Sequence, residues 1–303
     1  MKQKTQRRIF TDDIRESEFR ENGYTIISIN DNRLLDGLTE IYNNNLLTDT
    51  DGLQLSLKSK SLEQKICIHN NTTNLLADFF VHNFLDLKTF ASGFITKTPG
   101  VVNVAGLHRD PSFTDEKHAY TLLFWCPLTD TDETNGAIGV IPESNKIFNG
   151  YKGMVYGKFD FAPEEKLIEK KYGKILRLNR GEAVVFDTAL LHFSGQNITP
   201  YERVVFSCFL IPKEVTPVCY HYNNSKDTID CYKICNEEIF LNYYQDLVTK
   251  DELPFGFVKS ERFSEPIKIG LSEFEHVLKE YKREKSKEHT TFKKIERWFK
   301  SKL

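Results

Sequence analysis

Between about residues 92 and 212, short apolar runs alternate with turn residues, and this alternation is the feature that most limits the possible folds. Dipeptides such as Pro99-Gly100 and Asn135-Gly136 mark the turns between successive strands. The runs themselves cover residues 93–97, 120–128, 137–141, 175–178, 183–186 and 204–211. Many short strands separated by turns predict a β-sandwich or barrel, and here we expect a jelly roll.

Helical patterns precede this region. Thr11-Asp12-Asp13 can cap a helix that leads into Glu16–Glu21 and that Asn22-Gly23 would end. Tyr24–Ile29 then has the β-branched content of a strand. Residues 33–46 and 72–88 are typical of amphipathic helices. The N-terminal 90 residues are therefore expected to place helices against the β core.

The strand alternation is lost after Pro212. For residues 213–260 we expect a long irregular segment with one helix near 235–248, and for 271–303 a helical stretch. The expected fold class is mainly β with flanking helices: a jelly-roll, cupin-like core plus a C-terminal helical extension. The expected domains are 1–212, which holds the β core and its N-terminal helices, and 213–303, an extension packed on that core.

The composition is that of an ordinary globular protein. The chain has 303 residues, of which 40% are hydrophobic and 28% charged, and its formal net charge is −2. No apolar run approaches the roughly 18 residues of a membrane-spanning helix, and the basic N-terminus lacks the apolar region of a secretory signal. The six cysteines are too scattered for a disulfide scaffold. We therefore expect a cytoplasmic protein with reduced thiols.

Positive charge is concentrated at the C-terminus. Residues 279–303 contain ten Lys and Arg against four Glu, a net of +6 in a chain whose total is −2. The segment 292–300 also has an apolar face in this basic context. Such a helix can pack on the core and be solvated on its charged side, or it can touch an anionic membrane or a carrier protein. No nucleic-acid partner is expected.

His108 and Asp110 stand two positions apart in what the pattern predicts to be a strand. In an extended strand such residues share one face, so an imidazole and a carboxylate would point at the same place. A jelly roll can bring distant residues to one mouth of the barrel. His192, at the start of a later predicted strand, is the candidate third member of the group.

Two histidines and one carboxylate on one face of an iron leave three coordination positions open. A bidentate 2-oxo acid can take two of these positions and dioxygen the third. Arg203 follows His192 by eleven residues and opens another predicted strand. Its planar guanidinium can hold a carboxylate by two parallel hydrogen bonds, which would fix the far end of a dicarboxylic co-substrate.

The order of these residues resembles the phytanoyl-CoA dioxygenase-like (PhyH) family of Fe(II)/2-oxoglutarate oxygenases. The resemblance runs from about Phe10 to Pro212, roughly two thirds of the chain. The segments that carry it are Phe19–Tyr24 (FRENGY), Lys97–Gly100 (KTPG), His108–Asp110, Phe124–Asp130 (FWCPLTD), Asn135-Gly136, Ile141-Pro142, Gly181–Asp187 (GEAVVFD), His192–Asn197 (HFSGQN) and Arg203.

The resemblance implies a double-stranded β-helix in which His108, Asp110 and His192 are the iron ligands. It also implies that Arg203 clamps the distal carboxylate of 2-oxoglutarate and that Trp125 lies near this co-substrate. The implied enzyme is a dioxygenase that uses Fe(II), 2-oxoglutarate and dioxygen. It would hydroxylate an aliphatic carbon of a small or carrier-tethered, for example acyl-tethered, molecule with release of succinate and CO2.

Two alternatives stay open: a desaturase or cyclase of the same family, and a jelly-roll protein that binds ligands without turnover. Nothing in the sequence selects the substrate. Related halogenases replace the carboxylate ligand by a small residue, and because Asp110 is present, halogenation is not expected.

The chain departs from the family pattern at two places. The family usually has Gln between the first two ligands, where this chain has Arg109. Strand alternation turns that side chain away from the metal, so we expect a structural or surface role for it. The family's usual Pro-Gly-Ser-His is Pro142-Glu143-Ser144-Asn145 here. This change affects a loop and removes none of the three candidate ligands.

A zinc site could be considered at Cys219-x-His221 followed by Cys231-x3-Cys235, but these spacings fit no standard ligand pair. Cys67 and His69 would share a face if they lay in a strand, as a nucleophile and its base would, but no orienting third group can be read beside them. We expect structural or free cysteines in the first place and core residues in the second.

The segment 243–257 (YYQDLVTKDELPFGF) is aromatic and follows the β core. It is a candidate for a substrate lid or a wall of the pocket. The alternative is plain packing of the tail onto the barrel.

Overall fold

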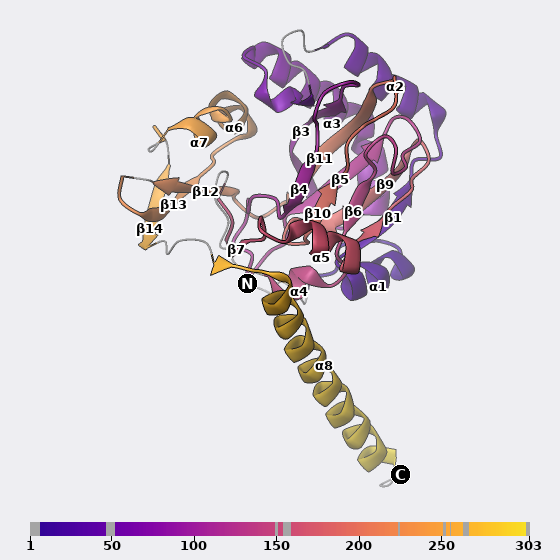
Figure 1. Cartoon of the computed structure of the whole chain (residues 1–303). Helices are drawn as coiled ribbons and strands as arrows, with labels where there is room; N and C mark the ends of the chain where they lie inside the picture. Colours follow the sequence, from indigo (N-terminus) through magenta and orange to yellow (C-terminus); the bar gives the residue numbers. More distant parts are fainter. Residues whose placement is uncertain are drawn as a thin grey trace.

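Two antiparallel β-sheets form the centre of the molecule (Figure 1). This computed structural model describes residues 7–46, 52–148, 151–153, 159–223, 225–250, 253–254, 256–262 and 267–300; of residues 248–249 and 287–300 it describes the backbone alone. The larger sheet has the strand order β1-β9-β5-β11-β3-β2 and the smaller sheet the order β4-β10-β6-β8. Their bounds are β1 Tyr24–Ser28, β2 Leu53–Leu55, β3 Leu87–Lys97, β4 Ala105–His108, β5 Leu122–Pro127, β6 Ile138–Val140, β8 Lys174–Ile175, β9 Glu182–Asp187, β10 His192–Ser194 and β11 Arg203–Pro212.

This arrangement is the double-stranded β-helix that the strand pattern predicts, and the predicted fold class is confirmed. Apolar side chains from both sheets fill the space between them, among them Trp125 of β5, Val205 of β11 and Val140 of β6. Successive residues of a strand point to opposite faces. The alternate residues of β11 therefore line either the space between the sheets or the outer face of the larger sheet.

Three helices cover the outer face of the larger sheet: α1 (Asp13–Asn22), α2 (Asn32–Asn43) and α3 (Leu62–Asn83) (Figure 1). Their apolar residues pack on Phe94, Phe124 and Phe206 of the sheet. Asp12 caps α1 by accepting a hydrogen bond from the backbone N–H of Arg15, and Gly23 ends it at φ +83°, a conformation that glycine adopts without strain.

Helix α3 begins ten residues before the helix that the amphipathic pattern predicts from residue 72. Ser61 caps it by accepting a hydrogen bond from Gln64 N–H at 3.1 Å. The polar run His69–Asn74 lies inside the helix and hides the apolar stripe from a pattern search. Cys67 and His69 are therefore on a helix, where residues two apart do not share a face.

The expectation of an irregular segment over residues 213–260 is wrong. The chain forms a three-stranded antiparallel sheet from β12 (Val218–Asn223), β13 (Thr228–Lys233) and β14 (Phe257–Arg262). Two helices, α6 (Glu237–Tyr243) and α7 (Asp246–Thr249), stand where one helix was expected near 235–248. The search for alternating apolar and polar residues did not predict these strands, because β12 and β13 are buried on both faces and have no clear polar side.

Helix α8 (Leu271–Lys300) starts on the core and then extends away from it (Figure 1). Phe274 of its first turn is fully buried and stacks on Phe148 with 5.3 Å between ring centroids. An apolar face was expected at residues 292–300, but these side chains lie outside the described part of the structure. Two short helices and two short strands complete this side: α4 (Ser144–Ile147), α5 (Glu165–Tyr172) and the parallel pair β7 (Phe159–Asp160) and β15 (Ile267–Lys268).

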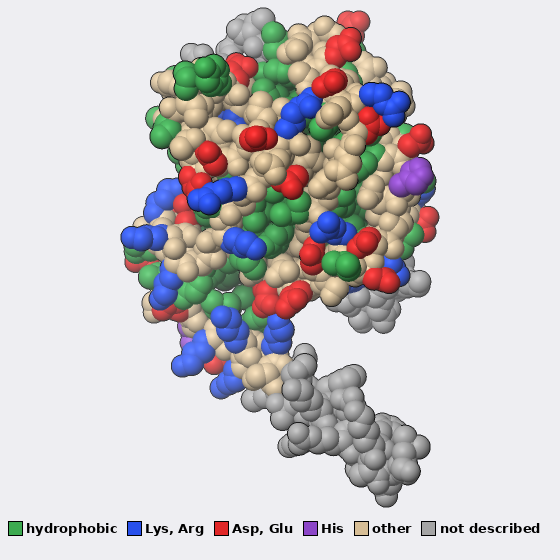
Figure 2. Space-filling view, turned by 90° about the vertical axis from the view of Figure 1, so that its right-hand side faces the viewer, with side chains coloured by type: hydrophobic (Ala, Val, Ile, Leu, Met, Phe, Trp, Pro, Cys, Tyr) green, Lys and Arg blue, Asp and Glu red, His purple; other side chains and the backbone are tan. Residues whose placement is uncertain are grey.

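Charges on the surface are mixed. On the face shown in Figure 2, Lys and Arg side chains alternate with Asp and Glu, in keeping with the small net charge of −2. Among the described residues, none of the helices combines the length and the hydrophobicity that crossing a bilayer requires.

A shared apolar cluster joins the β core to the C-terminal residues. Phe240 of α6 is fully buried, with its ring centroid 4.8 Å from that of Phe90 and 5.2 Å from that of Phe113. Cys219, Tyr232 and Tyr244 belong to the same cluster. These contacts support our proposal that residues 213–303 are an extension packed on domain 1–212.

We expect Phe240→Ala to lower the free energy of unfolding by about 3–5 kcal/mol, because it opens a cavity where the extension meets the core. Chemical denaturation followed by circular dichroism would measure the change. Phe257→Ala is the matched control: this ring is 61% exposed, and its loss should cost less than about 0.5 kcal/mol. Equal effects of the two substitutions would contradict the packing described here.

Candidate metal centre

Three candidate ligands meet at one end of the smaller sheet. His108 ends β4, His192 begins β10, and the two are direct partners across the antiparallel pair. Asp110 lies just beyond β4, where its N–H donates to Thr188 O at 3.0 Å. The ligand atoms of the three side chains all lie within 4.8 Å of one another. Among the described residues, this is the one group of His, Cys, Asp or Glu with such an arrangement.

Hydrogen bonds fix the orientation of both imidazoles. Nδ1 of His108 is 2.7 Å from Gly106 O, and Nδ1 of His192 is 2.9 Å from Leu190 O. A carbonyl oxygen only accepts, so each Nδ1 carries the hydrogen. Each Nε2 then keeps its lone pair, and these atoms face Asp110: the His108 Nε2–Asp110 Oδ1 distance is 3.8 Å and the His192 Nε2–Asp110 Oδ2 distance is 3.6 Å. This tautomer is the one that binds a metal through Nε2.

The electrostatics of the group also suit a cation. Burial lowers the pKa of His192 to about 4 and, together with the neighbouring His192, lowers the pKa of His108, so both rings are neutral at physiological pH. Burial raises the pKa of Asp110, whose Oδ2 is buried without a hydrogen-bond partner in the described structure. A buried, unsatisfied carboxylate oxygen is costly, and a metal ion would remove that cost. The donor set, two neutral imidazoles and a carboxylate, fits Fe(II).

Arg203 and Lys97 form a buried cation pair inside the barrel. They are register partners in β11 and β3 and are 1% and 0% exposed. The Nε and Nη1 atoms of Arg203 have no hydrogen-bond partner among the described residues, and its guanidinium lies 5.4 Å from the Trp125 ring. Lys97 donates to Ser194 O at 3.2 Å and to Gly195 O.

No described carboxylate forms an ion pair with either cation. Burial lowers the pKa of Arg203 to about 9, and burial with repulsion from Arg203 lowers the pKa of Lys97 to about 7. Two buried cations without a counter-ion indicate a site for an anion. Lys97 was missed in the sequence as a site residue. Its signal was its position in the apolar run just before Pro99-Gly100, where a lysine is unusual.

A small cavity of about 100 Å³ adjoins Asp110. Most of its lining is apolar, and two hydroxyl-bearing residues, Ser207 and Tyr244, complete it. Tyr244 comes from the C-terminal extension, and burial raises its pKa to about 12, with a smaller contribution from the charge of Asp110. The structure thus places one residue of the aromatic segment 243–257 in the wall of this cavity. The other lining residues are Leu55, Leu57, Gly93, Phe94, Ile95, Pro111, Phe113, Leu123 and Phe209.

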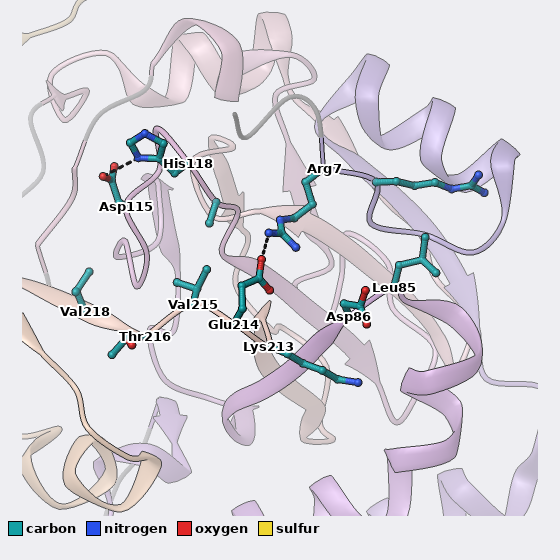
Figure 3. Close-up of a pocket in the computed structure, with 12 residues that line it drawn as sticks. Arg7, Leu85, Asp86, Asp115, His118, Lys213, Glu214, Val215, Thr216 and Val218 are labelled. Carbon is teal, nitrogen blue, oxygen red and sulfur yellow. Dashed lines mark hydrogen bonds and ion pairs between the residues drawn. The ribbon is translucent and has the colours of Figure 1, made fainter. Parts of the chain in front are cut away.

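A second cavity, of about 990 Å³, lies between the N-terminal segment and residues 213–218 (Figure 3). It is larger but shares no lining residue with the three candidate ligands. Two pairs of its lining residues bind each other: Arg7 pairs with Glu214, and His118 Nδ1 lies 3.0 Å from Asp115 Oδ2. We therefore assign the chemistry to the smaller cavity beside Asp110.

Arg109 points away from the candidate ligands, as strand alternation predicts. It is 4% exposed, donates to Phe148 O at 2.8 Å and lies 5.4 Å from the Phe159 ring. Asn145, which stands where the family has its usual His, donates to Asp187 Oδ2 at 3.1 Å. Both departures from the family pattern therefore make structural contacts.

The other cysteine patterns do not assemble into sites. Cys219 pairs with Tyr232 and Cys231 with Tyr220 across β12 and β13, so the two thiols lie on opposite faces of this sheet. On α3, Cys67 is exposed, whereas His69 is buried and lies 3.0 Å from Ser92 Oγ.

A family model described as Phytanoyl-CoA dioxygenase (PhyH) matches residues 44–205. A curated relative, Phytanoyl-CoA dioxygenase 1 of Oryza sativa subsp. japonica, is 30% identical over 126 residues, which cover 41% of this chain and 44% of the relative. The match thus spans less than half the length of that relative.

Two solved structures are similar to this chain at low sequence identity. The α-ketoglutarate-dependent carbocyclase SnoK from nogalamycin biosynthesis is 14% identical, with 72% of this chain and 89% of that chain covered and a TM-score of 0.46. EctD from S. alaskensis, solved with 2-oxoglutarate and 5-hydroxyectoine, is 17% identical, with 66% and 76% covered and a TM-score of 0.47.

We expect the metal-free protein to lose stability as the pH falls below about 6.5. His192 has a folded-state pKa of about 4 and an ordinary value of 6.5, so between these values the unfolded state binds the extra proton. The free energy of unfolding should then fall by up to about 1.4 kcal/mol per pH unit on account of this one residue. Denaturant titrations between pH 4.5 and 7.5 should show a shallower slope for His192→Gln. Parallel slopes would show that His192 is not the buried neutral group described here.

Proposed function

The chain belongs to the phytanoyl-CoA dioxygenase family, and from this premise we propose that it is a non-haem Fe(II)- and 2-oxoglutarate-dependent oxygenase. One observation carries the proposal: a single barrel holds both a group of two imidazoles and a carboxylate, and two buried cations that have no carboxylate partner among the described residues. An iron site and an anion site in the same barrel are what such a reaction requires.

His108, Asp110 and His192 would hold the iron through two Nε2 atoms and a carboxylate oxygen. Three ligands from the protein leave further coordination positions for the co-substrate and for dioxygen. Bound iron would supply the activation of dioxygen, a reaction that protein side chains do not perform. The residues of the chain contribute ligand geometry, because the carbonyls of Gly106 and Leu190 hold the imidazoles in the ligating tautomer.

Arg203 and Lys97 would hold the distal carboxylate of 2-oxoglutarate. Nε and Nη1 of Arg203 have no hydrogen-bond partner among the described residues, so the guanidinium has N–H groups free to donate charge-assisted hydrogen bonds to a carboxylate. The Trp125 ring, 5.4 Å from the guanidinium, limits where that carboxylate can sit. The 2-oxo acid end would then reach the metal. We propose that the co-substrate is oxidised to succinate and CO2.

The apolar cavity beside Asp110 supports an aliphatic target. Its walls exclude water from the place where the substrate would meet the metal, which favours reaction with the substrate over loss of the oxidant. We propose that the product is an alcohol formed at an aliphatic carbon of a small or carrier-tethered molecule. All six cysteines are free, which supports a cytoplasmic location.

The proposal is tested by the visible absorption of the anaerobic protein with Fe(II) and 2-oxoglutarate, since chelation of iron by the 2-oxo acid gives a charge-transfer band. We expect the band in wild type, its loss in His108→Ala and a shift to about tenfold or more higher 2-oxoglutarate concentration in Arg203→Ala. His118→Ala is the matched control, because His118 lies at the second cavity and pairs with Asp115. A folded, iron-loaded wild type without the band would overturn the proposed function.

Lys97 should make 2-oxoglutarate binding depend on pH. Its pKa of about 7 means that it is charged below pH 7 and becomes neutral above it. A bound carboxylate favours the charged form, so the affinity should be constant below pH 7 and fall above it by up to about tenfold per pH unit. Titrations of the charge-transfer band between pH 6 and 8.5 would measure this.

Two variants complete that experiment. Lys97→Met should bind 2-oxoglutarate weakly and with little pH dependence in this range. Lys117→Met, which removes an exposed lysine, should behave like wild type. An unchanged pH slope in Lys97→Met would show that Lys97 does not contact the co-substrate.

A further inference from the structure

Tyr244 brings a phenol side chain from the C-terminal extension to the cavity beside Asp110. The residue directly follows α6 and is 8% exposed. Its ring meets that of Phe240 edge to face, with 5.6 Å between centroids, in the apolar cluster that joins the extension to the β core. Neither the proposed iron site nor the proposed co-substrate site uses Tyr244, so its presence in the lining requires another explanation.

Hydrogen bonds on both sides of Tyr244 hold this part of the extension in place. Lys65 of α3 is buried and donates to the carbonyl of Leu241, three residues before Tyr244. The residue after Tyr244, Gln245, donates to Lys58 O at 2.6 Å. The segment that contains Lys58 also supplies apolar walls of the cavity. The position of the tyrosine is therefore fixed relative to the opposite wall.

The Tyr244 hydroxyl has no hydrogen-bond partner in the part of the chain that the structure describes. The other hydroxyl of the lining, that of Ser207, donates to Gly93 O at 3.5 Å. Burial raises the pKa of Tyr244 to about 12, so the phenol carries its proton at physiological pH and can donate. A phenol hydroxyl taken out of water without a partner is costly, and a molecule in the cavity could supply that partner.

The lining of the cavity favours an uncharged occupant. Among its described residues there is no Lys, Arg or His, and the one carboxylate, Asp110, would be a metal ligand. A charged group would lose its hydration in this apolar cavity and find no counter-ion there. At about 100 Å³, the cavity has room for a short aliphatic segment with one small polar group. That polar group must be neutral, and it must accept a hydrogen bond if it is to pair with Tyr244.

We propose that the Tyr244 hydroxyl donates a hydrogen bond to a neutral oxygen, of a carbonyl or hydroxyl group, on an aliphatic substrate that occupies the cavity beside Asp110. This inference rests on the proposed function and adds the substrate class to it. Tyr244 acts as a specificity-determining residue: one directional hydrogen bond in an apolar cavity fixes which carbon of the substrate lies toward the metal. The C-terminal extension thereby completes the substrate site.

The test uses the iron-loaded protein, anaerobic and saturated with 2-oxoglutarate, once the charge-transfer band has been observed. The probes are 2-pentanone, whose carbonyl accepts a hydrogen bond, and 2-methyl-1-pentene, which has nearly the same shape but no polar group. Pentanoate and pentylammonium are the charged comparisons. Saturation-transfer NMR measures the Kd of each probe.

Tyr244→Phe removes the hydroxyl and keeps the ring. It should weaken binding of 2-pentanone by about three- to tenfold and leave binding of 2-methyl-1-pentene within about twofold of wild type, which also shows that the cavity is intact. The matched control is Tyr243→Phe, which removes the hydroxyl of the preceding residue, one that does not line the cavity. It should leave both affinities unchanged. Wild type should bind 2-pentanone about tenfold or more tightly than either charged probe.

The inference is overturned if wild type that shows the band does not bind 2-pentanone, or if Tyr244→Phe binds it as wild type does. Equal losses of affinity for 2-pentanone and 2-methyl-1-pentene in Tyr244→Phe would also overturn it, since they would show a merely structural role. A charged probe that binds as tightly as 2-pentanone would contradict the substrate class. Absence of the band before any probe is added would instead overturn the proposed function itself, so the two failures are distinguishable.

Discussion

The pairing of β10 with β4 is the constraint on which the site depends. It sets His192 directly opposite His108, and the antiparallel pair of β11 and β3 sets Arg203 opposite Lys97 in the same way. A slip of one residue in either pair would turn these side chains to the other face of the sheet. Apolar packing between the sheets prevents such a slip, because it would expose residues such as Val205 and Val140. The register that builds the core therefore also brings together the residues of the proposed metal and anion sites.

These sites are costly in the absence of ligands. Asp110 Oδ2 and two nitrogens of Arg203 are buried without hydrogen-bond partners in the described structure. A protein selected for stability alone would pair or expose such groups. The surrounding aromatic core, with Trp125 over Arg203 and Phe186 against His192, holds them in place. Metal, co-substrate and substrate would satisfy these groups in turn, so binding and stability are coupled in this barrel.

Local patterns predicted a good part of the molecule. The six apolar runs correspond to strands β3, β5, β6, β8, β9 and β11, and the motif residues His108, Asp110 and His192 come together in space. The pattern failed where burial removed the polar side of a strand, as in β12 and β13, and where polar residues interrupted a helix, as in α3. Tyr244 was predicted only as part of the aromatic segment 243–257, and the sequence did not show which residue of that segment reaches the cavity. Lys97 was not identified as a neighbour of Arg203 because only the pairing of two distant strands brings these cations together.

The sequence by itself determined the alternation of short strands, the order of the candidate ligands and the candidate carboxylate clamp, since each of these is a matter of residue type and spacing along one segment. Tertiary structure alone decided which charges are left unpaired. Lys97 and Arg203 are cations about one hundred residues apart, and they repel each other only because two strands bring them together away from water. Tyr244 likewise reaches the cavity beside Asp110 only through the folding of the extension. The energy of a charge depends on its dielectric surroundings and neighbours, and these exist only once the chain has folded.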